Sequence, residues 1–157
     1  MNHTNGSKTA LLVEDNPDDE KLILYALRRT GIAHEVVVAH DGLEAIEYLF
    51  AFGTFAYRDP APLPDVVLLD LNLPKLGGLE VLERIRAHGR TRDLPVVIFS
   101  SSVDQEDAIR SGRLGANAFV RKPAALEEFV EAFRQLRGLG LRSLMTDANY
   151  PPSAKPA

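Results

Sequence analysis

The sequence predicts an α/β protein, a flavodoxin-like (βα)5 three-layer sandwich whose parallel five-stranded sheet has the strand order 2-1-3-4-5. Short apolar runs rich in valine and isoleucine recur along the chain, and several are continuous rather than alternating, as in strands buried on both faces. Segments with helical periodicity separate these runs, which implies right-handed βαβ crossovers. The 157 residues are about the size of one ordinary domain.

Five segments are predicted to be strands because each is a short apolar run bounded by polar or turn-forming residues. Their lengths are typical of strands in globular proteins. In chain order the segments are Thr9–Asp15, Glu35–Ala39, Asp65–Asp70, Pro95–Ser100 and Asn117–Val120.

Five helices are predicted between and after the strands, because apolar residues recur there with helical spacing. Pro17 and the three carboxylates after it suit the first turn of the first helix, where the helix dipole favours negative charge. Asp41 and Glu44 have the spacing of a capping box at the start of the second. The helices are Asp18–Thr30, Gly42–Phe52, a helix after Gly77-Gly78, Asp104–Gly112 and a helix that begins near Ala125.

The chain divides into three regions. Residues 1–8 are a polar lead that we expect to be disordered, and residues 9–137 form the folded domain. Residues 138–157 are a tail, partly apolar and then proline-rich, too short for a helix-turn-helix output domain. Within the domain, residues 51–64 form a long link with three prolines and three aromatics, and both a docking patch and a tolerated surface loop explain it.

The composition argues against several classes of protein. A net charge of −4 gives no electrostatic reason to expect nucleic acid or an anionic membrane as the main partner. The absence of cysteine excludes a disulfide framework and a thiolate metal site, and it suits a cytoplasmic location. The N-terminal MNHTNGSKT lacks the apolar core of a signal peptide, and no apolar run approaches the roughly 18 residues that cross a bilayer.

Polar side chains occur where the predicted strands end. These residues are, in chain order, Glu14 and Asp15, Asp70, Ser100 and, just past the fifth strand, Lys122. The carboxyl ends of parallel strands meet at one edge of the sheet, where ligands bind between the first and third strands. Each residue taken singly is better explained as the polar end of a strand. As a set they predict one crevice that holds carboxylates, a hydroxyl and an ammonium.

The chemistry of this set favours a cation and a phosphoryl group. Three carboxylates in one crevice repel one another unless a cation lies among them. Oxygen ligands without cysteine or histidine favour Mg²⁺, which keeps coordination positions for water and a phosphoryl oxygen. An ammonium and a hydroxyl are suitable donors to the other phosphoryl oxygens.

The order and spacing of these residues resemble the receiver domain of two-component response regulators, the CheY-like family. Asp70, Ser100 and Lys122-Pro123 are separated by 30 and 22 residues, as is usual in that family. The strings LLVEDN, LLDLNLPKLGGLEVLERIR and GANAFVRKP also match, and the resemblance covers roughly residues 9–137. The link at 51–64, which leads into LPD, resembles small stand-alone regulators that accompany phytochrome-type histidine kinases.

The resemblance implies roles for the residues that would handle phosphate. Asp70 would be the phosphoacceptor and the modified residue, and Lys122 would pair with the phosphoryl group. Pro123 would have a structural role, following a cis peptide that aims Lys122. Ser100 would donate a hydrogen bond to the phosphoryl group, and Ser100 and Phe119 would form the switch.

The resemblance also implies a Mg²⁺ site. Asp15 and Asp70 would bind the ion, and Glu14 would act mostly through a coordinated water. Asn72 would offer its backbone carbonyl. The ion would be the one cofactor of the protein.

The resemblance to response regulators also implies a function. The chain would be a phosphoacceptor signalling domain rather than an enzyme. Its partner would be a sensor histidine kinase, for which the resemblance suggests the bacteriophytochrome type. Phosphorylation would change the face made by the fourth helix, fifth strand and fifth helix. A homodimer through that face and a downstream phosphotransfer protein are the further partners expected.

The hydroxyl position departs from the family pattern, in which threonine is more common than the serine found here at Ser100. Serine keeps the donor but lacks the methyl group and part of the χ1 stiffness of threonine. We therefore hypothesise that the contact with phosphate is kept and that its coupling to the switch is looser.

Two alternatives remain open. A pseudo-receiver would keep the fold as a binding scaffold without phosphorylation, and the complete acidic set argues against it. A small Mg²⁺-dependent phosphatase would want a second acid two residues after Asp70, where Asn72 lies instead. The segment VEDNPDD after the first strand contains no phosphate-binding glycine motif, and FSSSVD is not the nucleophile motif of a serine hydrolase.

Overall fold

Five parallel strands form one sheet in the computed structural model, which describes residues 8–60, 62–101, 104–123 and 125–139. The strand order is β2-β1-β3-β4-β5, and every pairing is parallel. The predicted fold class and strand order are therefore confirmed. The strands are β1 Thr9–Val13, β2 Glu35–Ala39, β3 Val66–Asp70, β4 Val96–Ser100 and β5 Ala118–Arg121.

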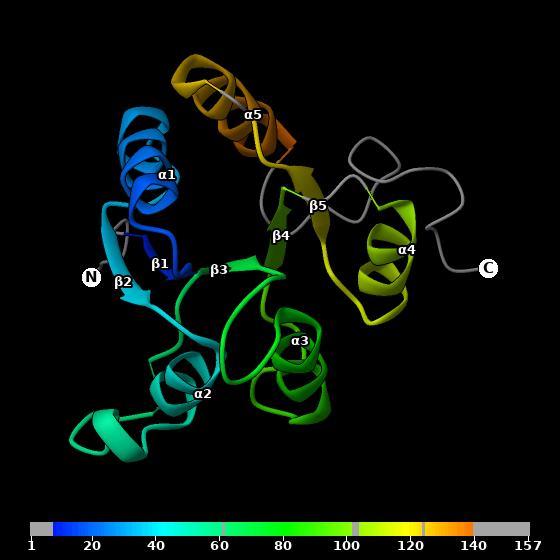
Figure 1. Cartoon of the computed structure of the whole chain (residues 1–157). Helices are drawn as coiled ribbons and strands as arrows, with labels where there is room; N and C mark the ends of the chain where they lie inside the picture. Colours follow the sequence, from blue (N-terminus) through cyan, green and yellow to red (C-terminus); the bar gives the residue numbers. More distant parts are fainter. Residues whose placement is uncertain (1–7, 61, 102–103, 124, 140–157) are drawn as a thin grey trace.

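Helices cover both faces of the sheet (Figure 1). Helices α1 and α5 lie side by side on one face, and α2, α3 and α4 lie on the other. Among the described residues no helix is long and apolar enough to span a membrane. The helices are α1 Pro17–Thr30, α2 Gly42–Phe50, α3 Gly78–Ala87, α4 Gln105–Arg113 and α5 Leu126–Leu139, with a short 3-10 helix, η1, at Gly53–Phe55.

The central strands are continuously apolar because alternate residues pack into two different cores. Leu12 and Leu68 pack with α1 and α5, whereas Leu11 and Leu69 pack with α2 and α3. All four are at most 2% exposed. Burial of each such side chain contributes about 1.5–3 kcal/mol, so both helical layers are held to the sheet by their own cores.

The helix starts agree with their predicted signals, with one difference. Asn16 caps α1 by accepting from the backbone N–H groups of Asp18 and Asp19. Asp41 caps α2 by accepting from the N–H of Glu44 at 2.7 Å. The Glu44 carboxylate accepts from the N–H of His40 rather than of Asp41, so the predicted capping box is formed in one direction only.

Some boundaries differ from the prediction. Helix α2 ends at Phe50, two residues early, because Ala51 takes a left-handed conformation with φ 58°. Helix α5 is described as far as Leu139, and the expected end of the domain at residue 137 stays a prediction. The expected N-terminal lead, except Lys8, and the expected tail from residue 140 onward lie outside the described residues.

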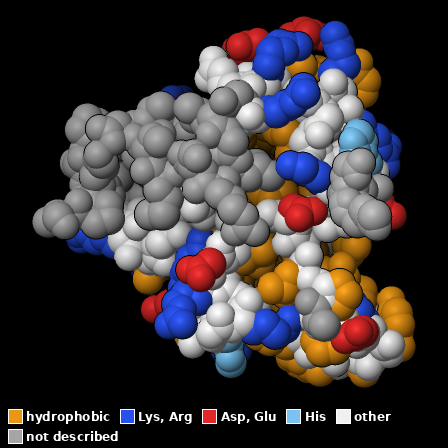
Figure 2. All heavy atoms as spheres, turned by 180° about the vertical axis from the view of Figure 1, so that it is seen from behind, with side chains coloured by type: hydrophobic (Ala, Val, Ile, Leu, Met, Phe, Trp, Pro, Cys, Tyr) orange, Lys and Arg blue, Asp and Glu red, His pale blue; other side chains and the backbone are white. Residues whose placement is uncertain are grey.

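The link at 51–64 packs against the end of α2. The Phe55 ring meets the Tyr48 ring edge-on at 5.2 Å, and the Arg58 guanidinium lies 3.9 Å above the same Tyr48 ring. Arg90, from the segment between α3 and β4, donates to the carbonyl of Leu49 at 2.6 Å. Tyr57 is 84% exposed, and Figure 2 shows hydrophobic side chains gathered over this end of the molecule. A docking role for these aromatics stays a prediction.

Candidate functional site

The predicted site residues lie at the carboxyl edge of the sheet, as the strand order requires. Glu14 follows β1, Asp70 ends β3, Ser100 ends β4, and Lys122 follows β5. Three of these side chains are almost completely buried: Glu14 is 1%, Asp70 5% and Ser100 0% exposed. The polar side chains at the carboxyl ends of β1, β3 and β4 are therefore shielded from solvent.

Glu14, Asp15 and Asp70 form a compact acidic cluster. Each offers one carboxylate oxygen, and the three oxygens lie within 4.8 Å of one another. Burial raises the pKa of Glu14 to about 7, and the neighbouring charge of Asp70 adds to the rise, while Lys122 opposes it. Mutual repulsion within the cluster is therefore only partly relieved by the residues around it.

The cluster fits a divalent cation. Oε1 of Glu14 is buried without a hydrogen bond of good geometry, although Nζ of Lys122 lies 2.9 Å from it as an ion pair. The three groups are hard oxygen ligands, the type that Mg²⁺ and Mn²⁺ prefer. A cation among them would satisfy the orphaned oxygen and remove the repulsion between the carboxylates.

Lys122 links this cluster to a fourth carboxylate. Its Nζ lies 2.9 Å from Oε1 of Glu14, 3.1 Å from Oδ2 of Asp70 and 2.9 Å from Oδ2 of Asp19. Burial works to lower the pKa of Lys122, but the carboxylates outweigh it and raise the pKa above its usual value. Lys122 is therefore a fixed positive charge, with a side chain only 9% exposed.

Sequence analysis did not identify Asp19. The residue is one of three consecutive acids in the first turn of α1, and a helix-dipole role explained all three equally well. No pattern in the sequence separates it from Asp18 or Glu20. Only the packing of α1 on the sheet brings Asp19, and not Asp18, to the ammonium of Lys122.

The segment around Lys122 differs from the prediction in one respect. The described residues contain no cis peptide bond, so the cis bond expected before Pro123 is not present. The N–H of Lys122 donates to the carbonyl of Ser100 at 2.8 Å, which continues the pairing of β4 and β5 past Arg121. This extension already brings the ammonium to Asp70, so a cis bond is not needed for that contact.

The two predicted switch residues lie on neighbouring strands. Ser100 is paired in register with Arg121, and Phe119, two residues earlier on β5, is paired with Ile98. The Phe119 side chain is half-buried and packs against the core on the α2 and α3 side. A move of Ser100 at the end of β4 therefore has a short route to Phe119 through the paired strands.

The loop after Asp70 is shaped by close backbone contacts. The N–H of Asn72 donates to Oδ1 of Asp70 at 3.2 Å, and the Asn72 side chain is exposed. Gly78 lies so near the end of β3 that a Cβ there would be 2.3 Å from the carbonyl oxygen of Asp70. Glycine at this position therefore allows α3 to start directly beside the acidic cluster.

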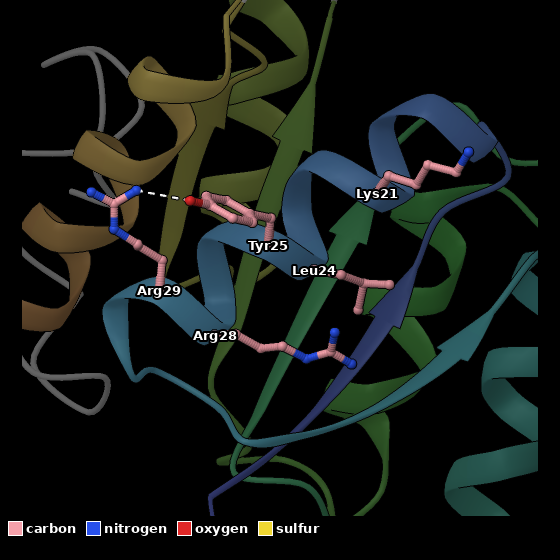
Figure 3. A pocket seen from close by; sticks show the side chains of 5 residues that line it. All are labelled: Lys21, Leu24, Tyr25, Arg28 and Arg29. Atoms are coloured by element: carbon pink, nitrogen blue, oxygen red, sulfur yellow. Dashed lines mark hydrogen bonds between the residues drawn. The ribbon is translucent and has the colours of Figure 1, made fainter.

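A surface depression on α1 lies among residues that are not part of the predicted site (Figure 3). Its volume is about 520 Å³, and its described lining comes from one helix: Lys21, Leu24, Tyr25, Arg28 and Arg29. Arg29 donates to the hydroxyl of Tyr25 at 2.9 Å. The depression is therefore a basic and aromatic surface rather than a second chemical centre.

Comparison with known proteins gives one consistent family. The model of the response regulator receiver domain matches residues 10–134. The chain is 35% identical over 136 residues to response regulator Rcp1 of Synechocystis sp., covering 87% of this chain and 88% of Rcp1. The crystal structure of the Mn²⁺-bound form of Rcp1 superposes with a TM-score of 0.75 at 34% identity, over 85% of this chain and 94% of that one.

Two further solved structures are similar. The phosphorylated cyanobacterial phytochrome response regulator RcpA has a TM-score of 0.76 and 38% identity, over 85% of this chain and 94% of RcpA. The bacteriophytochrome response regulator AtBRR has a TM-score of 0.70 and 47% identity, over 84% of this chain and 94% of AtBRR. With a family model that spans nearly all of the sheet and its helices, these similarities show that the chain belongs to the response regulator receiver domains, the CheY-like signalling proteins of two-component systems.

Proposed function

We propose that the chain is a response regulator receiver domain that accepts a phosphoryl group on Asp70, with Mg²⁺, from the phosphohistidine of a sensor histidine kinase. One observation carries the proposal. The Asp70 carboxylate is 5% exposed, belongs to the acidic cluster, and lies 3.1 Å from the ammonium of Lys122. The Asp70 carboxylate would be the nucleophile. A candidate cation site and the positive charge of Lys122 lie beside it.

The residues suggest how the transfer would proceed. An oxygen of Asp70 attacks phosphorus, the P–N bond to the kinase histidine breaks, and the ring nitrogen keeps the electron pair. The product is an acyl phosphate on Asp70. Lys122 and the hydroxyl of Ser100 would each bind a phosphoryl oxygen, which stabilises the charge that spreads over the phosphoryl group.

Glu14, Asp15, Asp70 and the backbone carbonyl of Asn72 would hold the divalent cation. The bound cation would supply charge neutralisation for a nucleophile and a donor that are both anionic. The similarity to the Mn²⁺-bound form of Rcp1 supports a divalent metal, and the chemistry of the ligands makes Mg²⁺ the proposed ion.

Signalling would follow from a change at the face made by α4, β5 and α5. Ser100 would move toward the phosphoryl group, and Phe119 would turn inward in response. The proposed partner kinase is of the bacteriophytochrome type, which the similarity to RcpA and AtBRR supports. A homodimer through the α4, β5 and α5 face, a downstream phosphotransfer protein and a cytoplasmic location complete the proposal.

Incubation with Mg²⁺ and acetyl phosphate tests the function directly. Intact-mass analysis should show the gain of one phosphoryl group that is stable in acid and labile in base, as an acyl phosphate is. Asp70→Asn is the matched control, because it keeps the size of the side chain and removes the nucleophile. If wild type gains no mass, or Asp70→Asn gains as much, Asp70 is not the phosphoacceptor and a pseudo-receiver becomes the better description.

A further inference from the structure

Asp19 makes a contact in the site that the receiver-family resemblance did not assign. Its Oδ2 lies 2.9 Å from Nζ of Lys122, as close as the Glu14 oxygen and closer than the Asp70 oxygen. The Asp19 side chain is 28% exposed, so the contact is partly shielded from water. An ion pair of this kind is stronger and more directional than one on an open surface.

The three carboxylates around Lys122 differ in what else they do. Glu14 and Asp70 belong to the acidic cluster that fits a divalent cation, and Asp70 is also the proposed phosphoacceptor. Asp19 is not a member of that cluster. A cation and a phosphoryl group would take up oxygens of Glu14 and Asp70, whereas the Asp19 carboxylate would remain available to Lys122.

Asp19 is held in place independently of the acidic cluster. Its backbone N–H donates to Oδ1 of Asn16 at 3.0 Å, within the cap of α1. The same helix buries Ile23, Ala26 and Leu27 against the sheet and α5. The Asp19 carboxylate is therefore attached to a rigid element, whereas Lys122 reaches the site on a flexible four-carbon stem.

We infer that Asp19 is the positioning residue that holds the ammonium of Lys122 at the phosphoryl site while Glu14 and Asp70 are engaged elsewhere. The inference rests on the proposed function. Asp19 acts through Lys122 and does not touch the phosphoryl group. Its role is to fix the place of one positive charge, and the rate of transfer depends steeply on such placement.

Two variants separate this role from a general effect of charge. Asp19→Asn removes the carboxylate and keeps the side-chain size. Asp18→Asn removes the same charge from the same helical turn. Asp18 is exposed, and it precedes Asp19 in the sequence without forming the ion pair with Lys122 that Asp19 forms. Any change in the helix dipole or net charge is thus the same in both variants.

The rate of phosphorylation by acetyl phosphate at saturating Mg²⁺ is the first measurement. We expect Asp19→Asn to be roughly tenfold slower than wild type, with unchanged Mg²⁺ affinity by calorimetry, and Asp18→Asn to match wild type. Asp19→Glu, which keeps a carboxylate, should recover part of the rate. The inference would be overturned if all variants were phosphorylated at the same rate, or if both asparagine variants were slowed equally. It would also be overturned if Asp19→Asn lost Mg²⁺ affinity by as much as it lost rate.

A second measurement needs no phosphorylation. In metal-free wild type, the three-way ion pair should slow proton exchange enough for NMR to detect the Lys122 ammonium, a signal that Lys122→Arg removes. Asp19→Asn should weaken this signal, and Asp18→Asn should leave it. An unchanged Lys122 signal in Asp19→Asn would contradict the positioning role. If wild type shows the signal but is not phosphorylated, the proposed function is contradicted and the contact of Asp19 with Lys122 is not.

Discussion

Nζ of Lys122 lies 2.9 Å from Oε1 of Glu14, and the Glu14 side chain is 1% exposed. A buried acid beside a buried base usually exists as an ion pair. Here burial and the charge of Asp70 nevertheless raise the pKa of Glu14 to about 7. A proton on Glu14 would therefore compete with a divalent cation at the cluster near neutral pH.

This competition predicts a pH-dependent affinity for Mg²⁺. A cation needs Glu14 ionised, and a raised pKa means that a proton must leave first when the pH is below about 7. We expect the affinity to be nearly constant above that pH and to fall by about tenfold per pH unit well below it. Calorimetric titration across this range measures the effect. Glu14→Gln should bind weakly with a flatter profile, and a wild-type affinity that does not fall with pH would contradict the prediction.

Exchange of Ser100 for threonine tests the coupling between the phosphoryl site and β5. Threonine keeps the donor and adds a methyl group that restricts χ1. We expect Ser100→Thr to be phosphorylated as well as wild type and to show larger phosphorylation-linked NMR shifts at Phe119. Ser100→Ala, which lacks the donor, should show smaller shifts than either. Equal shifts in wild type and Ser100→Thr would count against a looser switch.

Gly78 should not tolerate a side chain, although its neighbour Gly77 should. A Cβ on Gly78 would lie 2.3 Å from the carbonyl oxygen of Asp70 and 2.7 Å from Cα of Leu71. Both contacts are with backbone that cannot move away without shifting β3, so Gly78→Ala should lower the free energy of unfolding by about 2–4 kcal/mol. Gly77→Ala, whose Cβ would meet nothing nearer than 4.0 Å, is the matched control in urea denaturation.

Arg90 should stabilise the link at 51–64 without affecting the phosphoryl site. It donates to the carbonyls of Leu49 and Pro60, and its guanidinium lies 5.4 Å from the centre of the Phe50 ring. Arg90→Ala should cost about 1–2 kcal/mol and make the link more sensitive to proteolysis. Arg92→Ala, at an exposed position nearby, serves as the control. A phosphorylation rate that fell with Arg90→Ala would contradict this separation of loop and site.

Sequence patterns predicted the parts of the molecule that depend on local chemistry or on sheet topology. Buried strands such as Val66–Asp70 are recognisable because both faces are apolar, and the parallel order then puts Glu14 and Asp70 at one edge. The cap at Asp41 was predictable because capping depends on residues at most three positions away.

Features that depend on tertiary packing were not predictable. The early end of α2 follows from the left-handed conformation of Ala51, a residue with no preference for it. The Glu44 side chain reaches His40 instead of completing a capping box, a choice that the spacing of the acids cannot show. The contact of Asp19 with Lys122 joins residues 103 positions apart, and only the docking of α1 on the sheet determines it.

The crowding of carboxylates around Lys122 also has a consequence for the order of events. An ammonium has three N–H bonds, and carboxylate oxygens lie within 3.1 Å of Nζ on three different residues. Asp19 and Asp70 accept hydrogen bonds from this ammonium, and Glu14 forms an ion pair with it, so an incoming phosphoryl oxygen would have to compete with these carboxylates for Lys122. A divalent cation that binds Glu14 and Asp70 would reduce this competition. The site would thus select against phosphodonors that arrive before the metal, by occupancy rather than by shape.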